Sequence, residues 1–208
     1  MLQTLTRRSV LLRMAAAALV ASIGLLAGCD AAAPKPAFKA VDITGAEYAR
    51  TLALSDGDGQ RRTLADFKGK VVVVFFGYTQ CPDVCPTTMA ELAEVKRKLG
   101  PDGARVQGIF VSVDPDRDSA ALLKAYVANF GPDIVGLRGS AEETRAAAKE
   151  FKVFYAKVPG KTETSYTVDH TAGSYVFDIQ GRVRLFTRYG SGAQALADDL
   201  KILLAEKP

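Results

Sequence analysis

The sequence predicts an α/β domain built on a mixed central β-sheet that is flanked by helices, with a β-hairpin at its N-terminal end. Apolar runs without polar interruption, typical of strands buried on both faces, alternate with segments whose apolar residues recur at helical spacing. Near the C-terminus, two strand patterns flank a turn sequence at Asp178–Gly181. The last two strands are therefore expected to be antiparallel, which makes the sheet mixed.

The strands follow from local composition. Residues 51–64 resemble a hairpin with a Gly/Asp turn at Asp56–Gly59. The strongest strand pattern lies at Lys70–Tyr78, where no polar residue interrupts Val71–Gly77. The other predicted strands are residues 106–114, 133–137, 151–158, 173–178 and 182–189.

Helical patterns lie between these strands and after the last of them. In residues 87–100 the apolar positions recur at helical spacing up to a terminal glycine. A second helix is expected to begin at Ser140, because Glu143 three residues later completes a capping box. The predicted helices are residues 87–100, 119–131, 140–151 and 192–207, the last of them amphipathic.

The distribution of charge argues against nucleic-acid binding. The 208-residue chain carries 27 Lys and Arg against 23 Asp and Glu, but its first 28 residues hold three arginines and no acidic residue. Without that segment, 24 basic residues stand against 23 acidic ones. A clustered basic face of the kind that nucleic acids require is therefore not indicated.

The N-terminus has the pattern of an export signal. Residues 1–28 combine a basic start with an uncharged stretch, Met14–Gly28, which is shorter than the roughly 18 residues needed to span a bilayer. The segment ends in Leu26–Cys29, LAGC, which resembles a bacterial lipobox in which Cys29 is lipidated. Residues 29–40 then read as a lipidated tether, and Asp30 resembles a signal for retention at the inner membrane. We expect a lipid-anchored protein on the periplasmic face of that membrane.

Two alternatives stay open for this segment. It could remain as an uncleaved membrane anchor with an incidental cysteine. The pair Arg7 and Arg8 after Thr6 also weakly resembles a twin-arginine export motif, so the export route is not fixed. Either reading leaves the rest of the chain outside the cytoplasm, where a cysteine pair can serve as a disulfide, a redox couple or a soft-metal site.

The remaining two cysteines lie in FFGYTQCPDVCP, directly after the strongest strand. Cys81 and Cys85 are spaced to face the same way on a helical turn, and Pro86 suits the first turn of a helix. Zinc ribbons need two such pairs, whereas haem attachment and the thioredoxin redox motif have two residues between the cysteines. A purely structural disulfide would close a very small loop and add little stability. A nucleophile, a redox pair and a metal ligand all remain possible roles for the pair.

The chain contains one histidine, His170, expected in a loop just before the strand that starts at Ser174. If that strand neighbours the strand at Val71–Phe76, the loop lies beside the cysteines. Two thiolates and one imidazole form a soft ligand set that suits copper, in particular Cu(I). Asp169 or a backbone carbonyl would then orient the ring through its second nitrogen.

Three motifs, GYTQCPDVCPTTM, VSVDPDRDS and YTVDHTAGSYVFD, give the chain a strong resemblance to the Sco/SenC family of copper-binding proteins over residues 41–207. The resemblance implies a thioredoxin-like fold for a domain at residues 41–208. It implies Cys81, Cys85 and His170 as copper ligands, for Cu(I) and also for Cu(II). It further implies a copper chaperone, served by a donor protein, that delivers copper to the dinuclear centre in subunit II of cytochrome c oxidase.

Four aspartates accompany the implied site. The acidic element of the family carries over to Asp114 and Asp118, for which local roles are favoured over copper contact. Asp114 is expected to form a turn with the following proline, and Asp118 is expected to cap the helix that begins at Ser119. Asp83 is expected to affect local charge and Asp169 to support the histidine. Tyr166, from the third motif, is expected to be a packing residue.

The main alternative is a membrane-tethered thiol–disulfide oxidoreductase that keeps the cysteines of the oxidase copper site reduced, using the Cys81–Cys85 pair. The place that a cis-proline holds in thioredoxin-type enzymes is occupied here by Asp169–Thr171, which favours a metal over a peptide substrate. A thiol peroxidase and a copper sensor are further alternatives. The sequence therefore favours a metallochaperone rather than an enzyme.

Overall fold

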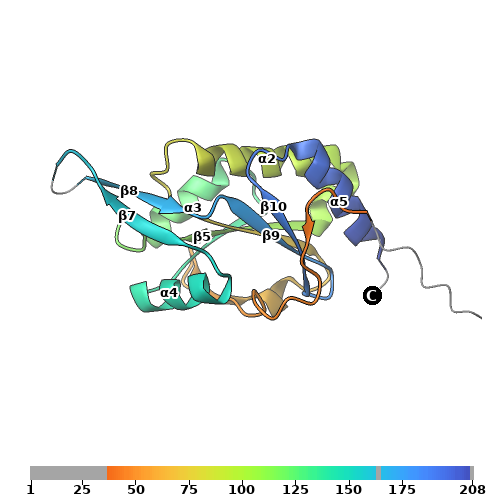
Figure 1. The fold of residues 1–208 in the computed structure, drawn as a ribbon, viewed down its shortest axis with the longest axis horizontal. Helices are drawn as coiled ribbons and strands as arrows, with labels where there is room; N and C mark the ends of the chain where they lie inside the picture. The colour runs from red at the N-terminus through yellow and green to blue at the C-terminus, as the bar shows by residue number, and fades with distance from the viewer. Residues whose placement is uncertain (1–36, 163–164, 207–208) are drawn as a thin grey trace, which may run out of the picture. The chain divides into compact units, whose positions relative to one another are not determined.

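A computed structural model describes residues 37–162 and 165–206. Within these residues the chain forms an eight-stranded sheet in the order β1-β10-β9-β4-β5-β6-β2-β3, and a separate two-stranded ribbon, β7-β8 (Figure 1). The strands of the large sheet run in both directions, which confirms the predicted mixed α/β architecture. The predicted signal segment, Cys29 and most of the predicted tether lie outside the described residues.

The strands are β1 Val41–Asp42, β2 Ala53–Asp56, β3 Arg61–Thr63, β4 Val71–Gly77, β5 Val106–Ser112, β6 Ile134–Arg138, β7 Tyr155–Pro159, β8 Tyr166–His170, β9 Gly173–Phe177 and β10 Val183–Arg188. The α-helices are α2 Val84–Lys98, α3 Ala120–Ala128, α4 Ala141–Glu150 and α5 Ala193–Ala205. Two short 3₁₀ segments are η1 Leu64–Phe67 and η2 Gly100–Arg105.

The centre of the sheet is formed by β4 and β5, and every residue in both strands is buried. They pair in parallel from Val71 opposite Val106 to Gly77 opposite Ser112. This agrees with the uninterrupted apolar runs, because a strand covered by helices on both faces needs apolar side chains on both. On its other edge β4 pairs antiparallel with β9. The end of β4 therefore lies beside the beginning of β9.

Helices cover both faces of the sheet. In Figure 1, α2 and α5 lie along one face and α4 lies on the opposite side. Aromatic contacts follow the alternation of β4: the ring of Phe75 packs with Phe110, whose ring lies 5.2 Å from Tyr126 of α3. The next residue, Phe76, points the other way and packs 5.0 Å from Phe151 at the end of α4.

The N-terminal end of the described chain is fastened to α5. The buried carboxylate of Asp199 accepts hydrogen bonds from the backbone N–H groups of Lys39 and Ala40, at 2.9 and 2.8 Å. Immediately after these residues, β1 pairs with β10 at the edge of the sheet. The N-terminal hairpin predicted from the Gly/Asp turn is also present, because β2 pairs with β3 and joins the sheet through β6.

The ribbon is the main departure from the sequence-based expectation. The predicted strand at 151–158 is shorter, as β7, and it does not join the large sheet. Its partner β8 was not predicted, and it places His170 at the end of a strand rather than in a loop. The reason is physical: in β8 only Val168 is buried, so the segment has no apolar run to mark it. Helix α2 also begins earlier than predicted, at Val84.

In the part of the chain that the structure describes, no helix has both the length and the apolar character that crossing a membrane requires.

A buried charge network closes the β9–β10 hairpin. The carboxylate of Asp178 has no exposed surface and accepts hydrogen bonds from the backbone of Gln180 and from the backbone and side chain of Arg182. It also pairs with Arg184, which in turn pairs with Glu206. Burial alone would raise the pKa of Asp178, but the hydrogen bonds from Arg182 and Arg184 outweigh it and lower that pKa.

We expect Asp178→Ala to lower the free energy of unfolding by about 3 kcal/mol at pH 7, because it leaves the buried Arg184 without one of its carboxylate partners. Urea denaturation measures this loss. Since the pKa of Asp178 is lower in the folded state, its stabilisation is present above about pH 4 and disappears as the pH falls through that pKa. The difference in the free energy of unfolding between the variant and the parent should therefore become smaller in acid.

The matched control is Asp58→Asn, which breaks an ion pair with Lys124 in which both side chains are exposed. We expect no measurable change in unfolding for this control. Equal stability of Asp178→Ala and the parent at pH 7 would contradict a stabilising role for the network.

Candidate metal centre

The two cysteines lie at the connection between the end of β4 and the first turn of α2. After Gly77 the chain turns, and the backbone N–H of Cys81 donates to the carbonyl of Tyr78 at 3.2 Å. Cys81 precedes the helix and is partly exposed, whereas Cys85 lies in the first turn of α2 and is fully buried. The expectation that one helical turn would carry both residues is therefore wrong. The turn before α2 brings the sulfurs together, with the Cys85 N–H 3.3 Å from the Cys81 sulfur.

The end of β4 leaves space for the Cys85 sulfur because residue 77 is a glycine. A Cβ at Gly77 would lie 2.8 Å from the Cys85 Sγ and 2.9 Å from the ring of Phe75. Both separations are shorter than real carbon contacts allow. The sulfur is thus packed directly against the backbone of the central strand.

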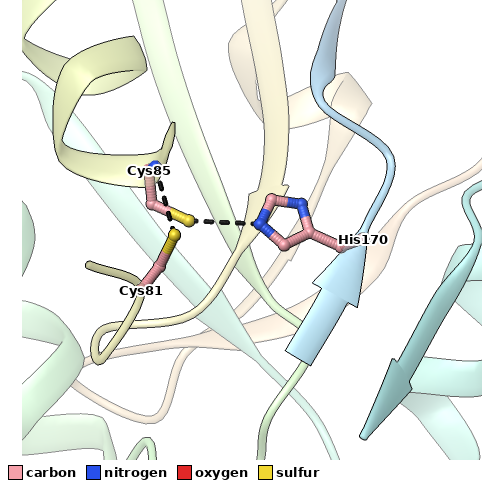
Figure 2. A group of neighbouring side chains, drawn as sticks. All are labelled: Cys81, Cys85 and His170. Carbon is pink, nitrogen blue, oxygen red and sulfur yellow. Dashed lines mark hydrogen bonds between the residues drawn. The ribbon is translucent and has the colours of Figure 1, made fainter. Parts of the chain in front are cut away.

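The chain's single histidine reaches the same place from the ribbon. His170 ends β8, and its Nε2 lies 3.3 Å from the Cys85 Sγ (Figure 2). The rings of Phe75 and Tyr78 contact it edge-on, at centroid distances of 5.7 and 6.0 Å. The expected proximity of the imidazole to the sulfurs, 85 residues away for Cys85, is confirmed.

The orientation of the imidazole is set by the backbone of the next residue, Thr171. His170 Nδ1 lies 3.2 Å from the carbonyl oxygen of Thr171. A carbonyl can only accept, so Nδ1 carries the proton and the Nε2 lone pair is directed at the sulfur. Burial lowers the pKa of His170, which keeps the ring in the neutral form that binds metals. Of the two orienting groups foreseen from the sequence, the backbone carbonyl does this, and Asp169 lies exposed on β8.

The three side chains form one compact group. The two Sγ atoms and a ring nitrogen of His170 all lie within 4.8 Å of one another, and no fourth His, Cys, Asp or Glu joins them among the described residues. Metal bonds to sulfur and nitrogen of about 2.3 and 2.0 Å bring one ion within reach of such a set. Burial raises the pKa of the Cys85 thiol, so the metal-free site holds a proton there.

Asp118 does not cap the following helix as expected. That role belongs to Ser119, whose hydroxyl accepts from the N–H of Leu122. The fully buried Asp118 carboxylate instead accepts from the Thr79 hydroxyl at 2.6 Å and from the Ser112 hydroxyl at 2.6 Å. Its contacts depend on tertiary structure, since Thr79 lies 39 residues away in the turn that carries Cys81.

The other acidic residues and Tyr166 lie around the group. The turn expected at Asp114 is confirmed, because its carbonyl accepts from the Arg117 and Asp118 N–H groups. Its buried side chain pairs with Arg117 and accepts from the Tyr166 hydroxyl at 2.8 Å. Asp83 is exposed at the start of α2 and accepts from the Thr87 hydroxyl.

Sequence reasoning missed the contributions of Gly77, Tyr78 and Arg117. Each lies inside one of the three motifs, but its role depends on contacts across the fold that no spacing rule signals. The site opens onto a surface cavity of about 570 Å³, whose lining includes Cys81, His170 and the exposed ring of Phe154. One side of the candidate centre is therefore accessible from solvent, while Cys85 forms its closed side.

Comparison with known proteins places this geometry in context. The model of the SCO1/SenC family matches residues 41–205. The mouse mitochondrial protein SCO2 homolog is 41% identical over 139 residues, which cover 66% of this chain and 53% of that protein. The chain thus spans about half the length of the curated mitochondrial relatives it matches.

Two solved structures show the same fold. Bradyrhizobium japonicum ScoI, determined with copper bound, has 41% sequence identity and a TM-score of 0.68, covering 74% of this chain and 98% of its own. The apo Sco1 protein of Thermus thermophilus has 39% identity and a TM-score of 0.72, covering 81% and 98%. The resemblance seen in the three motifs thus extends over the whole described sheet, with its thioredoxin-like fold. The chain belongs to the SCO1/SenC family.

Proposed function

We propose that this chain is a copper chaperone that binds Cu(I) through Cys81, Cys85 and His170 and delivers it to the dinuclear copper centre of cytochrome c oxidase subunit II. The observation that carries the proposal is the convergence of the two sulfurs and the imidazole within 4.8 Å, from segments far apart in the sequence. It is supported by the copper found in the Bradyrhizobium relative.

The donor set favours copper over other metals. Thiolates are soft ligands that select Cu(I), and imidazole also suits copper. Structural zinc sites are closed by four protein ligands, whereas the described residues offer three. A three-ligand site retains copper and still leaves one direction of approach to the ion open.

The open direction is suited to transfer. Cys81 lines the cavity, whereas Cys85 is buried behind it. A thiolate of the acceptor can bind the copper from the cavity, and the Cu–Cys81 bond then breaks while the released sulfur takes up a proton. The same exchange at Cys85, followed by release of the Cu–His170 bond to leave a neutral imidazole, passes the ion on without its entering water. Oxidation of the pair to a disulfide removes both thiolates and so prevents loading.

The N-terminal residues 1–40 support a location at the inner membrane. A lipid on Cys29 would hold the domain on the periplasmic face of the inner membrane, with residues 29–40 as the tether. A copper donor protein would load the site there. Anchoring keeps chaperone and membrane-bound oxidase in the same thin layer, which raises their effective concentration.

The second candidate is a thiol–disulfide oxidoreductase that reduces the oxidase cysteines. One observation favours it: Cys81 is reachable from the cavity while Cys85 lies directly behind it. In such a pair, Cys81 can attack a substrate disulfide and form a mixed disulfide with one substrate sulfur. Cys85 can then attack the Cys81 sulfur and release the reduced substrate. The two electrons pass from the dithiol to the substrate, which leaves a Cys81–Cys85 disulfide.

Replacement of the histidine separates the two functions. We expect His170→Ala to weaken Cu(I) binding by at least about 100-fold, because it removes a ligand and not merely a group that supports one, and to leave the dithiol redox-active. Competition with a chromophoric Cu(I) chelator measures the first, and equilibration with glutathione measures the second. The matched control is Asp169→Asn on the exposed side of the same strand, which should match the parent.

In cells, His170→Ala should fail to restore a functional oxidase copper centre in a strain that lacks the parent gene. Full restoration by this variant would show that copper delivery is the wrong function and would favour the reductase.

Each cysteine of the pair is expected to be indispensable for both activities. Cys85→Ser should lose tight Cu(I) binding, and reduced parent protein should bind one equivalent of copper that the disulfide form does not. Titration of copper and of free thiols on the same samples measures this. Cys29→Ser, which removes the third cysteine, is the control and should keep full stoichiometry. Tight binding by Cys85→Ser would rule out the three-ligand site.

Copper binding should strengthen as the pH rises. Burial raises the pKa of the Cys85 thiol, so near neutrality copper has to displace its proton. Each displaced proton makes the apparent affinity rise by about tenfold per pH unit. Chelator competition between pH 6.5 and 8.5 measures the slope. His170→Ala should keep this slope, because the parent imidazole is already neutral there. A pH-independent affinity would contradict thiolate ligation.

A further inference from the structure

The segment between β5 and α3, Asp114–Asp118, touches both halves of the candidate metal centre. One half is the turn that carries Cys81, and the other is β8, which ends at His170. Among the described strands β8 pairs only with β7, so β8 itself belongs to no ladder of the large sheet. We propose that Asp114–Asp118 is a clamp that sets the separation between the sulfurs and the imidazole, with Asp114, Arg117 and Asp118 as positioning residues. This inference rests on the proposed copper function.

The clamp holds the cysteine side through Asp118. Its buried carboxylate accepts from the Thr79 N–H, at 3.2 Å, and from the Thr79 hydroxyl, at 2.6 Å. Ser112, the last residue of β5, donates to the same carboxylate at 2.6 Å. Because Thr79 lies two residues before Cys81, these bonds tie the cysteine turn to the end of β5.

The clamp holds the histidine side through Asp114. The Tyr166 hydroxyl donates to the buried Asp114 carboxylate at 2.8 Å. Tyr166 lies on β8, four residues before His170. The Arg117 guanidinium pairs with that carboxylate and lies 3.6 Å from the centre of the Tyr166 ring. It also donates to the Tyr166 carbonyl at 2.8 Å. Tyr166 is thus held by its hydroxyl, its ring and its backbone.

Arg117 also links the two halves directly. The nitrogen that donates to the Tyr166 carbonyl lies 3.2 Å from the side-chain oxygen of Gln80, the residue before Cys81. A single guanidinium therefore contacts the cysteine turn and the histidine strand at once. Its planar group, with several donors in fixed directions, is suited to hold such partners in one geometry.

The ribbon needs support of this kind. Two-stranded ribbons are marginally stable in water, and in Figure 1 the β7–β8 ribbon extends beyond the sheet. Within β8 only Val168 is buried. Contacts of the His170 ring with Phe75 and Tyr78 hold one end of the strand. The clamp at Tyr166 holds the other end and so limits rotation of the strand about His170.

The same two segments offer a matched control. Lys157 of β7 pairs with Asp116 at 2.6 Å, but the side chains are 52% and 65% exposed. Exposed ion pairs contribute little because solvent screens them. Asp116→Asn therefore changes a charge in the same segment, toward the same ribbon, without loosening the clamp.

The first test uses full-length, reduced, metal-free protein. Tyr166→Phe removes only the hydroxyl and keeps the ring beneath Arg117, so the fold should be retained. We expect amide hydrogen exchange at Thr167 and Asp169, which lie opposite Val158 and Ala156 in hydrogen-bonded positions of the ribbon, to become several-fold faster in Tyr166→Phe and in Asp114→Asn. Exchange in β4 and β5 should be unchanged. Asp116→Asn should exchange like the parent. Unchanged exchange in Tyr166→Phe would overturn the clamp.

The second test asks whether the clamp affects copper binding through His170. By chelator competition, Tyr166→Phe should weaken Cu(I) binding by about tenfold, as loss of a group that supports a ligand does. In the His170→Ala background the same change should have no further effect, because the strand it positions no longer carries a ligand. A tenfold loss in both backgrounds would overturn the inference, since it would indicate a general structural role.

The two proposals can fail separately. If His170→Ala binds Cu(I) as tightly as the parent, the proposed copper site is wrong, whereas the exchange measurements still decide whether Asp114–Asp118 holds the ribbon. If His170→Ala weakens binding and Tyr166→Phe changes neither exchange nor affinity, the copper site stands and the clamp is wrong.

Discussion

The antiparallel pairing of β9 with β4 is the constraint on which the candidate centre depends. Because the strands run in opposite directions, the end of β4 meets the start of β9, with Phe75 opposite Ser174. The cysteine turn follows the end of β4, and His170 precedes the start of β9. A parallel β9 would place its first residue at the far edge of the sheet, about seven residues or more than 20 Å from the sulfurs. The sheet direction thus brings one histidine to two cysteines.

The centre combines a rigid side with an accessible one. Cys85, in the first turn of α2, is buried against Gly77, and the His170 ring is held by Phe75, Tyr78 and the Thr171 carbonyl. Cys81 is less enclosed and borders the cavity. A carrier has to bind its cargo and also release it, and a site with one exposed ligand meets both requirements. The same asymmetry suits thiol exchange, which is why the fold alone does not separate the two candidate functions.

The sequence predicts those features that depend on local chemistry. The buried strands β4 and β5, the Ser140–Glu143 capping box and the Asp178 turn are all present, because apolar runs and short-range hydrogen bonds specify them. Features that depend on distant partners were missed. β8 has a single buried residue, and the Asp118 side chain bonds to Thr79 instead of capping α3. The candidate ligand residues are recognisable because cysteine and histidine are rare in this chain, with three cysteines and one histidine.

Gly77 shows how a site can constrain a position that the backbone leaves free. Its φ is not among the positive values found for other glycines of the described chain, so an alanine would suit this strand conformationally. What excludes a larger residue is the sulfur of Cys85 together with the ring of Phe75, which would lie 2.8 and 2.9 Å from an added Cβ. Natural variation at this position would therefore be limited by the chemistry of a neighbouring side chain, and a laboratory substitution there would act as a steric probe of thiol placement.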